Sequence, residues 1–397
     1  MTASLHVKNV RPMAGASTDV LILDGRFADP GSPAPPDVPE VDGGGAIMIP
    51  GLVEAHTHLD KSLLGLPWYR NEVGPRLIDK ITNEREVKTR LGIEPARQSE
   101  RQAILSASKG STHIRSHVDV DTEHGLAGVE GVMATRDKLR DLVDIELVAF
   151  PQSGMMIRPG TVELLEEAMK LGCEVVGGLD PSGIDRDPKG HLDVVFDLAE
   201  RYGKPVDIHL HERGELGGFS MELIIERTAA LGMQGHVTIS HAFCLGQPDH
   251  TYVAELTEGL AENRIHIMTT GPAAVTAPVV RELRAAGIVV CSGSDGIRDT
   301  WGPFGNADML ERAMLVSQRN NFRRDDEVEM ALDVCTFGGA AVMERGDYGL
   351  APGCSGDLVL VEAESLAEAV ANRPPRKLVV KAGRVTARDG VCVIEAP

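Results

Sequence analysis

The sequence predicts an α/β protein made of a (β/α)8 TIM barrel plus a small β-sandwich built from both termini. Three observations predict it. Short apolar runs alternate with amphipathic helical stretches through the middle of the chain. Glycines follow the helical runs, and both ends read as strands joined by turns. A doubly wound open sheet is the alternative, but neither an early G-x-G-x-x-G motif nor a Walker-type loop is present.

The two ends of the chain resemble each other and differ from the middle. Short apolar runs alternate with turn residues up to about Pro50, with a Gly/Pro-rich stretch over 30–45, and the last part of the chain has the same character. We therefore expect residues 1–49 and 346–397 to form one composite β-sandwich domain and residues 50–345 to form the barrel. The strands expected in the end domain are 5–10, 19–22, 357–361, 377–381, 385–387 and 391–395.

The middle of the chain supplies the strands and helices of the barrel. Apolar and β-branched runs, as expected for strands covered on both faces, lie at 47–54, 112–120, 145–151, 174–179, 205–211, 236–242, 265–270 and 288–292. Amphipathic stretches predict helices at 94–109, 162–171, 192–202, 221–231 and 280–286. Gly172, Gly203, Gly232 and Gly287 follow helical runs and are expected to end them.

Composition excludes several classes of function. The chain has 40 basic and 59 acidic residues, a formal net charge of −19, so nucleic acid binding is not expected. Its six cysteines form no C-x-x-C pair, which is typical of reduced, buried thiols in a cytoplasmic protein. No signal peptide begins the sequence, and no apolar run reaches the ~18 residues of a membrane span. We expect a cytoplasmic protein with a small-molecule substrate; a homo-oligomer is compatible with a barrel of this size.

Imidazole and carboxylate groups recur where the predicted strands end. His56 and His58 lie two residues apart on the first barrel strand and therefore project to the same side. The end of the fifth strand reads DIHLHE and contains His209, and the eighth strand runs into Asp295. Because the C-terminal ends of barrel strands meet at one rim, these four side chains are expected to hold a divalent ion.

The number of ions also follows from the sequence. A two-ion site in such a barrel usually needs a bridging group, such as a carbamylated lysine, at the end of the fourth strand. That end reads GGLDP at 177–181, and the nearest preceding lysine, Lys170, comes before the strand. We therefore predict one divalent ion.

Three further residues at the rim are candidates for catalysis or substrate binding. His241, near the end of the sixth strand, is a metal ligand, a core histidine or, as we favour, a group that orients hydroxide. Glu212, three residues after His209, is a rim carboxylate or, more in keeping with its place, a proton shuttle. Gln152, after the third strand, is either a loop amide or a reader of a heterocycle edge. His211 is left without a role.

Other residues carry weaker signals. Arg115, His117 and Asp119 alternate on the second strand and form either an interior polar network or substrate contacts. Trp68 and Trp301 lie in predicted rim loops, where they either pack in the ordinary way or stack on a flat ring.

Long motifs then identify a resemblance. They read GLVEAHTHLDKS at 51–62, RSHVDVD at 115–121, VAFPQSG at 148–154, VVGGLDP at 175–181, SHAF at 240–243 and SDGIRDTWGPFGN at 294–306. The chain resembles the amidohydrolase superfamily in the branch that holds cytosine deaminases and N-isopropylammelide isopropylaminohydrolases. The resemblance runs through nearly the whole chain.

The resemblance implies the fold given above and assigns roles to its residues. His56, His58, His209 and Asp295 would hold Zn or Fe, Glu212 would shuttle a proton, and His241 would orient hydroxide. Gln152, with Lys61 and Trp301, would contact the substrate. The implied reaction is hydrolytic deamination of a small nitrogen heterocycle, cytosine-like or aminotriazine-like, with release of ammonia.

The sequence also departs from the relatives that it resembles. Cytosine deaminases tend to carry a second acidic residue after the metal aspartate, where this chain has Gly296, whereas Lys61 follows the pattern of the ammelide enzyme. That enzyme has Asp in place of Glu212. Two hydrolases therefore stay as alternatives, one acting on N-alkylaminotriazines of the N-isopropylammelide type and one on cyclic amides. A catalytically inactive, metal-binding barrel is a third.

Overall fold

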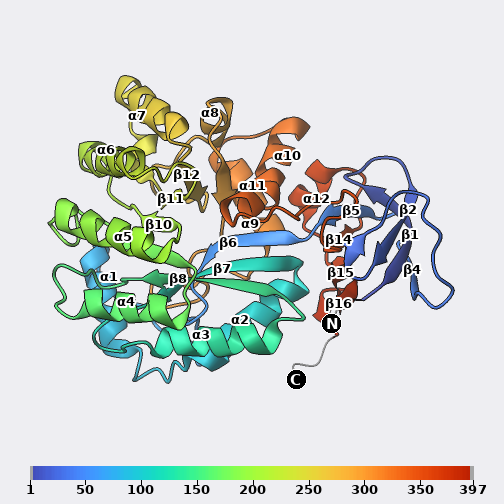
Figure 1. Ribbon diagram of the computed structural model, residues 1–397, viewed down its shortest axis with the longest axis horizontal. Helices are drawn as coiled ribbons and strands as arrows, with labels where there is room; N and C mark the ends of the chain where they lie inside the picture. Colours follow the sequence, from blue (N-terminus) through green and yellow to red (C-terminus); the bar gives the residue numbers. More distant parts are fainter. Residues whose placement is uncertain (1–2, 394–397) are drawn as a thin grey trace.

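The computed structural model describes residues 3–393 and contains two sheets (Figure 1). An eight-stranded parallel sheet, ordered β13-β12-β11-β10-β9-β8-β7-β6, forms the barrel, and a nine-stranded sheet joins the two ends of the chain. The predicted (β/α)8 barrel with a terminal β domain is confirmed. No helix among the described residues is both long enough and apolar enough to cross a membrane.

The barrel strands are short and buried, and helices cover their outer side. The strands are β6 Leu52–Thr57, β7 Ser111–Asp119, β8 Asp144–Phe150, β9 Val175–Leu179, β10 Val206–His209, β11 Val237–Ser240, β12 His266–Thr269 and β13 Val290–Ser292. The helices are α1 Leu77–Val87, α2 Pro95–Ser108, α3 Ala127–Leu139, α4 Thr161–Leu171, α5 Pro188–Tyr202, α6 Gly214–Ala230, α7 His250–Glu262, α8 Val280–Ala285, α9 Met309–Arg319, α10 Asp325–Asp333 and α11 Phe337–Val342.

The prediction of a single strand at 47–54 is wrong. The expected run 47–54 is two strands, because the chain passes from one sheet to the other at Gly51. β5, Ile47–Pro50, pairs with β1 and β14 in the terminal sheet, and only β6 belongs to the barrel. A Cβ on Gly51 would lie 2.1 Å from Thr112 Oγ1, so the close approach of β7 requires glycine at the crossing. The apolar residues continue through both strands, so the sequence pattern did not reveal this crossing.

The predicted helix ends agree with the structure. Gly172, Gly203, Gly232 and Gly287 have φ of 113°, 59°, 67° and 82°, the left-handed region in which glycine terminates a helix. The predicted helix 221–231 in fact begins earlier, at Gly214, so α6 starts just after the functional segment 209–212.

The terminal sheet is assembled from segments far apart in sequence. Its strands are β1 Leu5–Pro12, β2 Thr18–Leu23, β3 Arg26–Phe27, β4 Glu40–Asp42, β5, β14 Leu358–Val361, β15 Arg376–Lys381, β16 Arg384–Arg388 and β17 Val391–Cys392, with α12 Leu366–Asn372 after β14. Its apolar cluster is separate from the barrel core and combines Leu5, Val7 and Ile22 with Leu358 and Val380. The expected strand 391–395 is seen only as β17, since residues 394–397 lie outside the described part of the chain.

The barrel closes beside the predicted metal residues. The Asp295 amide donates to the His56 carbonyl at 2.9 Å, and the Thr57 hydroxyl donates to the Asp295 carbonyl at 2.8 Å. Gly293 passes so close to β6 that a Cβ would lie 2.3 Å from the His56 carbonyl oxygen. Closure thus positions His56 and Asp295 against each other.

We expect Gly293→Ala to separate the strands at this closure. The added methyl group meets backbone rather than a mobile side chain, so the free energy of unfolding should fall by about 1–3 kcal/mol or more, together with the metal content. Chemical denaturation and elemental analysis measure the two effects. Gly302→Ala is the matched control, because a Cβ there meets nothing within 4 Å; equal stability of the two variants would contradict the prediction.

Candidate metal centre and active site

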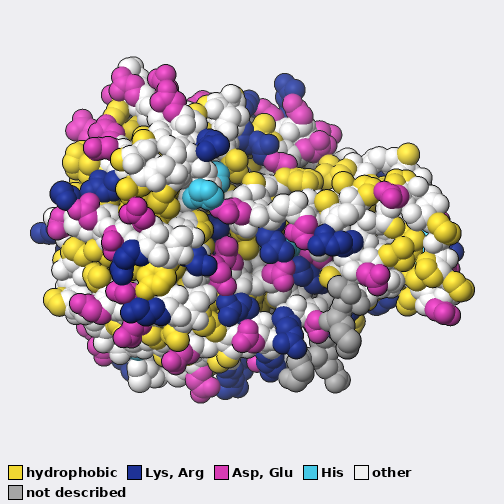
Figure 2. Space-filling view, viewed as in Figure 1, with side chains coloured by type: hydrophobic (Ala, Val, Ile, Leu, Met, Phe, Trp, Pro, Cys, Tyr) yellow, Lys and Arg dark blue, Asp and Glu magenta, His cyan; other side chains and the backbone are white. Residues whose placement is uncertain are grey.

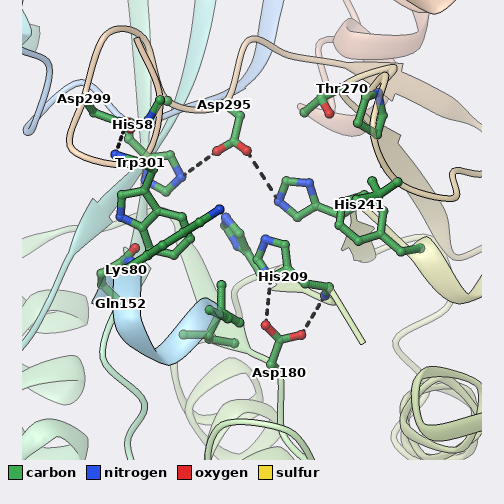
Figure 3. Close-up of a pocket in the computed structure, with 18 of the residues that line it drawn as sticks. His58, Lys80, Gln152, Asp180, His209, His241, Thr270, Asp295, Asp299 and Trp301 are labelled. Atoms are coloured by element: carbon green, nitrogen blue, oxygen red, sulfur yellow. Dashed lines mark hydrogen bonds and ion pairs between the residues drawn. The ribbon is translucent and has the colours of Figure 1, made fainter. Parts of the chain in front are cut away.

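Four histidines from three regions of the barrel rim meet around Asp295. His56 and His58 come from β6, His209 ends β10, and His241 follows β11. Asp295 Oδ1 lies 3.7 Å from His56 Nε2 and 3.2 Å from His58 Nε2, and its Oδ2 lies 4.0 Å from His241 Nε2. Figure 3 shows the Asp295 carboxylate between His58 and His241. The sequence prediction that these groups converge agrees with this geometry.

The donor set fits a divalent cation. Among the described residues, Nε2 of His56, Nε2 of His241 and both ring nitrogens of His209 are buried without a hydrogen-bond partner. Unpartnered buried polar atoms are costly, and a cation would satisfy them. Burial lowers the pKa of His58 to about 4 and holds the pKa of His209 and His241 well below the usual value. These imidazoles are therefore neutral, the form that binds metal.

The aspartate has the opposite electrostatic character. Burial by itself would raise the pKa of Asp295, but the neighbouring imidazoles of His56, His58 and His241 hold it well below its ordinary value. The site thus combines neutral imidazoles with one ionised carboxylate. Its backbone is strained as well, since Asp295 has φ of 62° and His241 has φ of 72°. Such strain in non-glycine residues is typical of functional sites.

A hydrogen-bonded chain behind His56 fixes which nitrogen faces the cluster. Ser240 Oγ donates to Asp207 Oδ1 at 2.6 Å, so its oxygen is available to accept from His56 Nδ1 at 3.0 Å. Arg115 binds the other oxygen of Asp207 at 3.1 Å. His56 therefore keeps its proton on Nδ1 and turns Nε2 toward Asp295. Ser240 and Asp207 were not predicted, although Asp207 precedes His209 by two residues and so projects to the same side.

The compact group of possible ligand atoms includes His241. Atoms of His56, His209, His241 and Asp295 all lie within 4.8 Å of one another, while His58 approaches through its 3.2 Å contact with Asp295. Both His58 and His241 are thus within reach of an ion at this place. The metal content of variants at His58 and at His241 decides which of the two is a ligand.

Glu212 lies beside the cluster in a fixed position. Its Oε1 accepts from the amides of Ser182 at 2.9 Å and Gly183 at 2.6 Å, and its Oε2 accepts from the Ser220 hydroxyl. The carboxylate lines the pocket and is 7% exposed. Burial raises its pKa despite these hydrogen bonds. A carboxyl group with a raised pKa at a pocket wall is suited to proton transfer.

His211, which the sequence left without a role, has a defined place. Its Nδ1 contacts Asp180 Oδ2 at 2.7 Å, and its ring stacks on that of His241 with centroids 4.3 Å apart. Asp180 itself, at the end of β9, has φ of 37°. His211, fixed by Asp180, thus packs against the ring of His241.

Lys61 and Gln152 also line this pocket. Lys61 Nζ donates to Gln152 Oε1 at 2.9 Å, to Asp119 Oδ1 at 3.0 Å and to Glu84 Oε1 at 3.3 Å. Lys88 adds a second ammonium group 2.5 Å from Asp119 Oδ2. Burial raises the pKa of Glu84 to about 8, whereas Lys61 and Lys88 overcome burial and lower that of Asp119.

Arg115 and Asp119 of the second barrel strand belong to an interior network, one of the two alternatives that the sequence left open, whereas neither ring nitrogen of His117 has a hydrogen-bond partner among the described residues. Arg115 binds Asp207 and Glu146, and Asp119 binds Lys61 and Lys88. Among the described residues, neither Arg115 nor Asp119 lines the pocket.

The two tryptophans differ in position. Trp301 lines the pocket, donates its indole N–H to Glu84, and has Lys80 Nζ 5.6 Å from its ring centroid. Trp68 is 70% exposed and is absent from the pocket wall. Only Trp301 is therefore placed to contact a ring. Glu84 and Lys80 come from α1, in the long connection between β6 and β7, which periodicity did not place.

The structure gives a steric reason for Gly296. A Cβ there would lie 1.9 Å from Asp299 Oδ2, while Asp299 Oδ1 accepts from the amides of Trp301 at 2.8 Å and Gly302 at 3.0 Å. The Asp299 carboxylate thus occupies the space of a side chain at position 296, and an acidic group is supplied from three residues later in the chain.

A pocket of about 810 Å³ opens over these groups. Its inner end is polar. Leu216 and Phe304, which are 49% and 82% exposed, bring apolar side chains to its outer part, whereas Phe243 is buried beside the His241 ring. The molecular surface outside it mixes acidic, basic and apolar side chains on the face seen in Figure 2. The site is thus a deep cavity with an apolar mouth, typical of a small-molecule enzyme.

Comparison with known proteins agrees with this geometry. The model of the amidohydrolase family matches residues 39–394. The chain belongs to the amidohydrolase family. The family resemblance that the motifs indicated is thereby confirmed.

Three relatives illustrate the match. N-isopropylammelide isopropyl amidohydrolase of Pseudomonas sp. strain ADP is 32% identical over 89% of each chain. The crystal structure of N-isopropylammelide isopropylaminohydrolase from Burkholderia multivorans has a TM-score of 0.95 and 50% identity, covering 98% of this chain and 100% of that one. That of 5-methylcytosine deaminase from Klebsiella pneumoniae with 5-fluorocytosine has 0.85 and 28%, covering 98% and 99%.

Proposed function

We propose that this amidohydrolase is a metal-dependent hydrolytic deaminase of a small amino-substituted nitrogen heterocycle, cytosine-like or aminotriazine-like. The observation that carries the proposal is the cluster of neutral imidazoles with unpartnered nitrogens around Asp295, at the inner end of a pocket that also contains Glu212 and Gln152. Relatives that deaminate cytosines or remove isopropylamine from ammelides support the same class of reaction.

His56, His58, His209 and Asp295 would hold one divalent ion, Zn or Fe. When bound, such an ion lowers the pKa of water toward neutrality and so supplies hydroxide at pH 7. Asp295, ionised and next to three imidazoles, accepts the proton of the attacking water. His241, stacked on His211, is neutral and orients the hydroxide toward the substrate.

Glu212 is the residue that transfers protons to the substrate. As hydroxide adds to the ring carbon that bears the exocyclic amine, Glu212 would give its proton to the adjacent ring nitrogen. Glu212 would then take the proton of the hydroxyl group formed on that carbon and pass it to the leaving amine, and the proton held by Asp295 would restore Glu212. Its raised pKa keeps the carboxyl group protonated to a higher pH than an ordinary glutamate. Loss of the amine leaves a lactam, and the bonds to Ser182, Gly183 and Ser220 keep the carboxyl group in place.

Gln152, Lys61 and Trp301 form the wall that recognises the substrate. Trp301 offers an aromatic face, and Gln152 offers an amide at the depth of the metal cluster. We also infer a cytoplasmic enzyme, able to form a homo-oligomer, without nucleic acid or membrane partners; the net charge of −19 supports the absence of a polyanion partner.

A second candidate function is hydrolysis of an N-alkylaminotriazine with release of a small amine. The apolar outer part of the 810 Å³ pocket supports it, because an unsubstituted heterocycle leaves that part unfilled. The 50% identity to the Burkholderia enzyme and the presence of Lys61 point the same way.

The experiment that tests the proposal measures amine release by the Zn- and Fe-loaded protein. The panel contains cytosine, isocytosine, 5-methylcytosine, creatinine, pterin, ammeline, ammelide and N-isopropylammelide. Ammonia from an amino heterocycle supports the deaminase, and isopropylamine alone moves the function to the second candidate. If the protein released neither ammonia nor isopropylamine and instead opened the ring of a cyclic amide, both candidates would be refuted. A soluble protein that purifies without metal would favour an inactive barrel.

A further inference from the structure

The amide of Gln152 can face the pocket in two ways, and Lys61 decides between them. An ammonium group has three N–H donors and no acceptor. The Gln152 atom 2.9 Å from Lys61 Nζ must therefore be the carbonyl oxygen Oε1. The opposite orientation would place an NH₂ group against an ammonium group and lose a charge-assisted hydrogen bond.

The hydrogens of Lys61 are all engaged by the protein. Its three acceptors are Oε1 of Gln152, Oδ1 of Asp119 and Oε1 of Glu84, at 2.9, 3.0 and 3.3 Å. The Lys61 side chain is 4% exposed. Lys61 thus has no N–H left for a substrate, although its side chain borders the pocket.

The other end of the amide faces the cavity. Gln152 lines the pocket, and among the described residues its Nε2 has no acceptor and is not enclosed. With Oε1 held by Lys61, Gln152 turns its NH₂ group, which carries two N–H donors and no acceptor, toward the cavity. A donor pair is complementary to a carbonyl or an unprotonated ring nitrogen and repels an amino group.

We propose that Lys61 is a positioning residue that locks Gln152 as a hydrogen-bond donor, so that the enzyme selects heterocycles with an oxo group rather than an amino group at the position facing Gln152. This inference rests on the proposed function for its substrate class. According to this inference, Lys61 does not contact the substrate directly, and Gln152 faces the substrate as a hydrogen-bond donor.

Matched ligand pairs test the inference. Cytosine and 2,4-diaminopyrimidine differ by one oxo-to-amino exchange, as do ammelide and ammeline. For the metal-loaded enzyme we measure kcat/KM by amine release and, for a member that is not turned over, the dissociation constant by calorimetry. Wild type should favour the oxo member of a pair by about tenfold to a hundredfold, as expected when a buried donor meets a donor instead of an acceptor.

Three variants test how Lys61 orients Gln152. Lys61→Met frees the amide to rotate, so the preference should fall to within about threefold, and Lys61→Arg, which keeps a cationic donor, should restore it. Gln152→Glu keeps an acceptor for Lys61 but puts a second oxygen in the pocket, so the preference should invert. Gln318→Glu, the same exchange on an exposed part of α9, is the control and should leave it unchanged. Gln152→Glu also provides the test where Lys61→Met does not fold.

The outcomes separate this inference from the proposed function. Turnover of oxo and amino members at equal rates overturns the inference and leaves the function standing. Preferential binding of oxo members without any amine release refutes the function and leaves the inference standing. An unchanged preference in Gln152→Glu, or no binding of either member by wild type, overturns the inference.

Discussion

Replacement of Glu212 by Gln should abolish turnover while the protein keeps its metal. The amide retains the size of the side chain and an oxygen for the amides of Ser182 and Gly183, but it has no proton to give to the ring nitrogen or the leaving amine. General acid catalysis is typically worth ~10²–10⁴ in rate, and we expect a loss in kcat of at least that size. Steady-state kinetics and elemental analysis of the purified variant measure both quantities.

The pH dependence of wild type gives an independent check on Glu212. A general acid must start protonated, so kcat/KM should fall as the pH rises through the pKa of Glu212. Because burial raises that pKa, this basic limb should lie above the range of an exposed glutamate. The sign for stability is the same: the protonated side chain is favoured in the folded state, and this contribution is lost as the pH rises through the raised pKa. Gln, which does not ionise, should therefore leave the Tm at neutral pH equal or higher.

The control for Glu212 is Glu215→Gln, the same exchange on an exposed residue at the start of α6. It should leave kcat, metal content and Tm unchanged. If Glu212→Gln retained near full activity, Glu212 would not be the proton shuttle. If it lost metal together with activity, the carboxylate would belong to the metal centre.

The convergence of the site residues could be predicted because it depends on topology alone. In a (β/α)8 barrel every parallel strand ends at the same rim, so His56, His58, His209 and Asp295 must lie close together once the strands are identified. Strand assignment in turn needed only short apolar runs and the glycines that end the helices. The break at Gly51 was missed because buried strands of two different sheets are equally apolar.

What could not be predicted comes from groups whose positions depend on tertiary packing. Glu84 and Lys80 lie on α1, inside a long connection whose path is set by contacts with Lys61 and Trp301 rather than by local periodicity. Asp299 reaches the space above Gly296 because its loop turns on hydrogen bonds to the Trp301 and Gly302 amides. The separations of these residues in the sequence follow neither the helix period nor the strand period. A single sequence therefore does not reveal that they are in contact.

Replacement of Asp295 by Ala should remove both metal and activity. Asp295 is the sole carboxylate in the compact cluster with His56, His209 and His241, so its loss leaves only imidazoles, which carry no negative charge, to bind a doubly charged cation. Wild type should gain thermal stability when Zn or Fe is added, because a ligand that binds only the folded state raises the Tm, and the variant should gain none. Elemental analysis and thermal unfolding with and without metal measure these effects.

The backbone at Asp295 requires a second variant and a control. With φ of 62°, Ala at this position is strained, whereas Asn tolerates the left-handed region. Asp295→Asn should therefore fold as well as wild type and still bind metal poorly, which separates the loss of a ligand from a loss of structure. Asp137→Ala, on an exposed face of α3, should change neither property. Normal metal content in both variants at Asp295 would exclude it as a ligand and would move that role to His241, whose Nε2 is the next buried nitrogen without a partner in the same cluster.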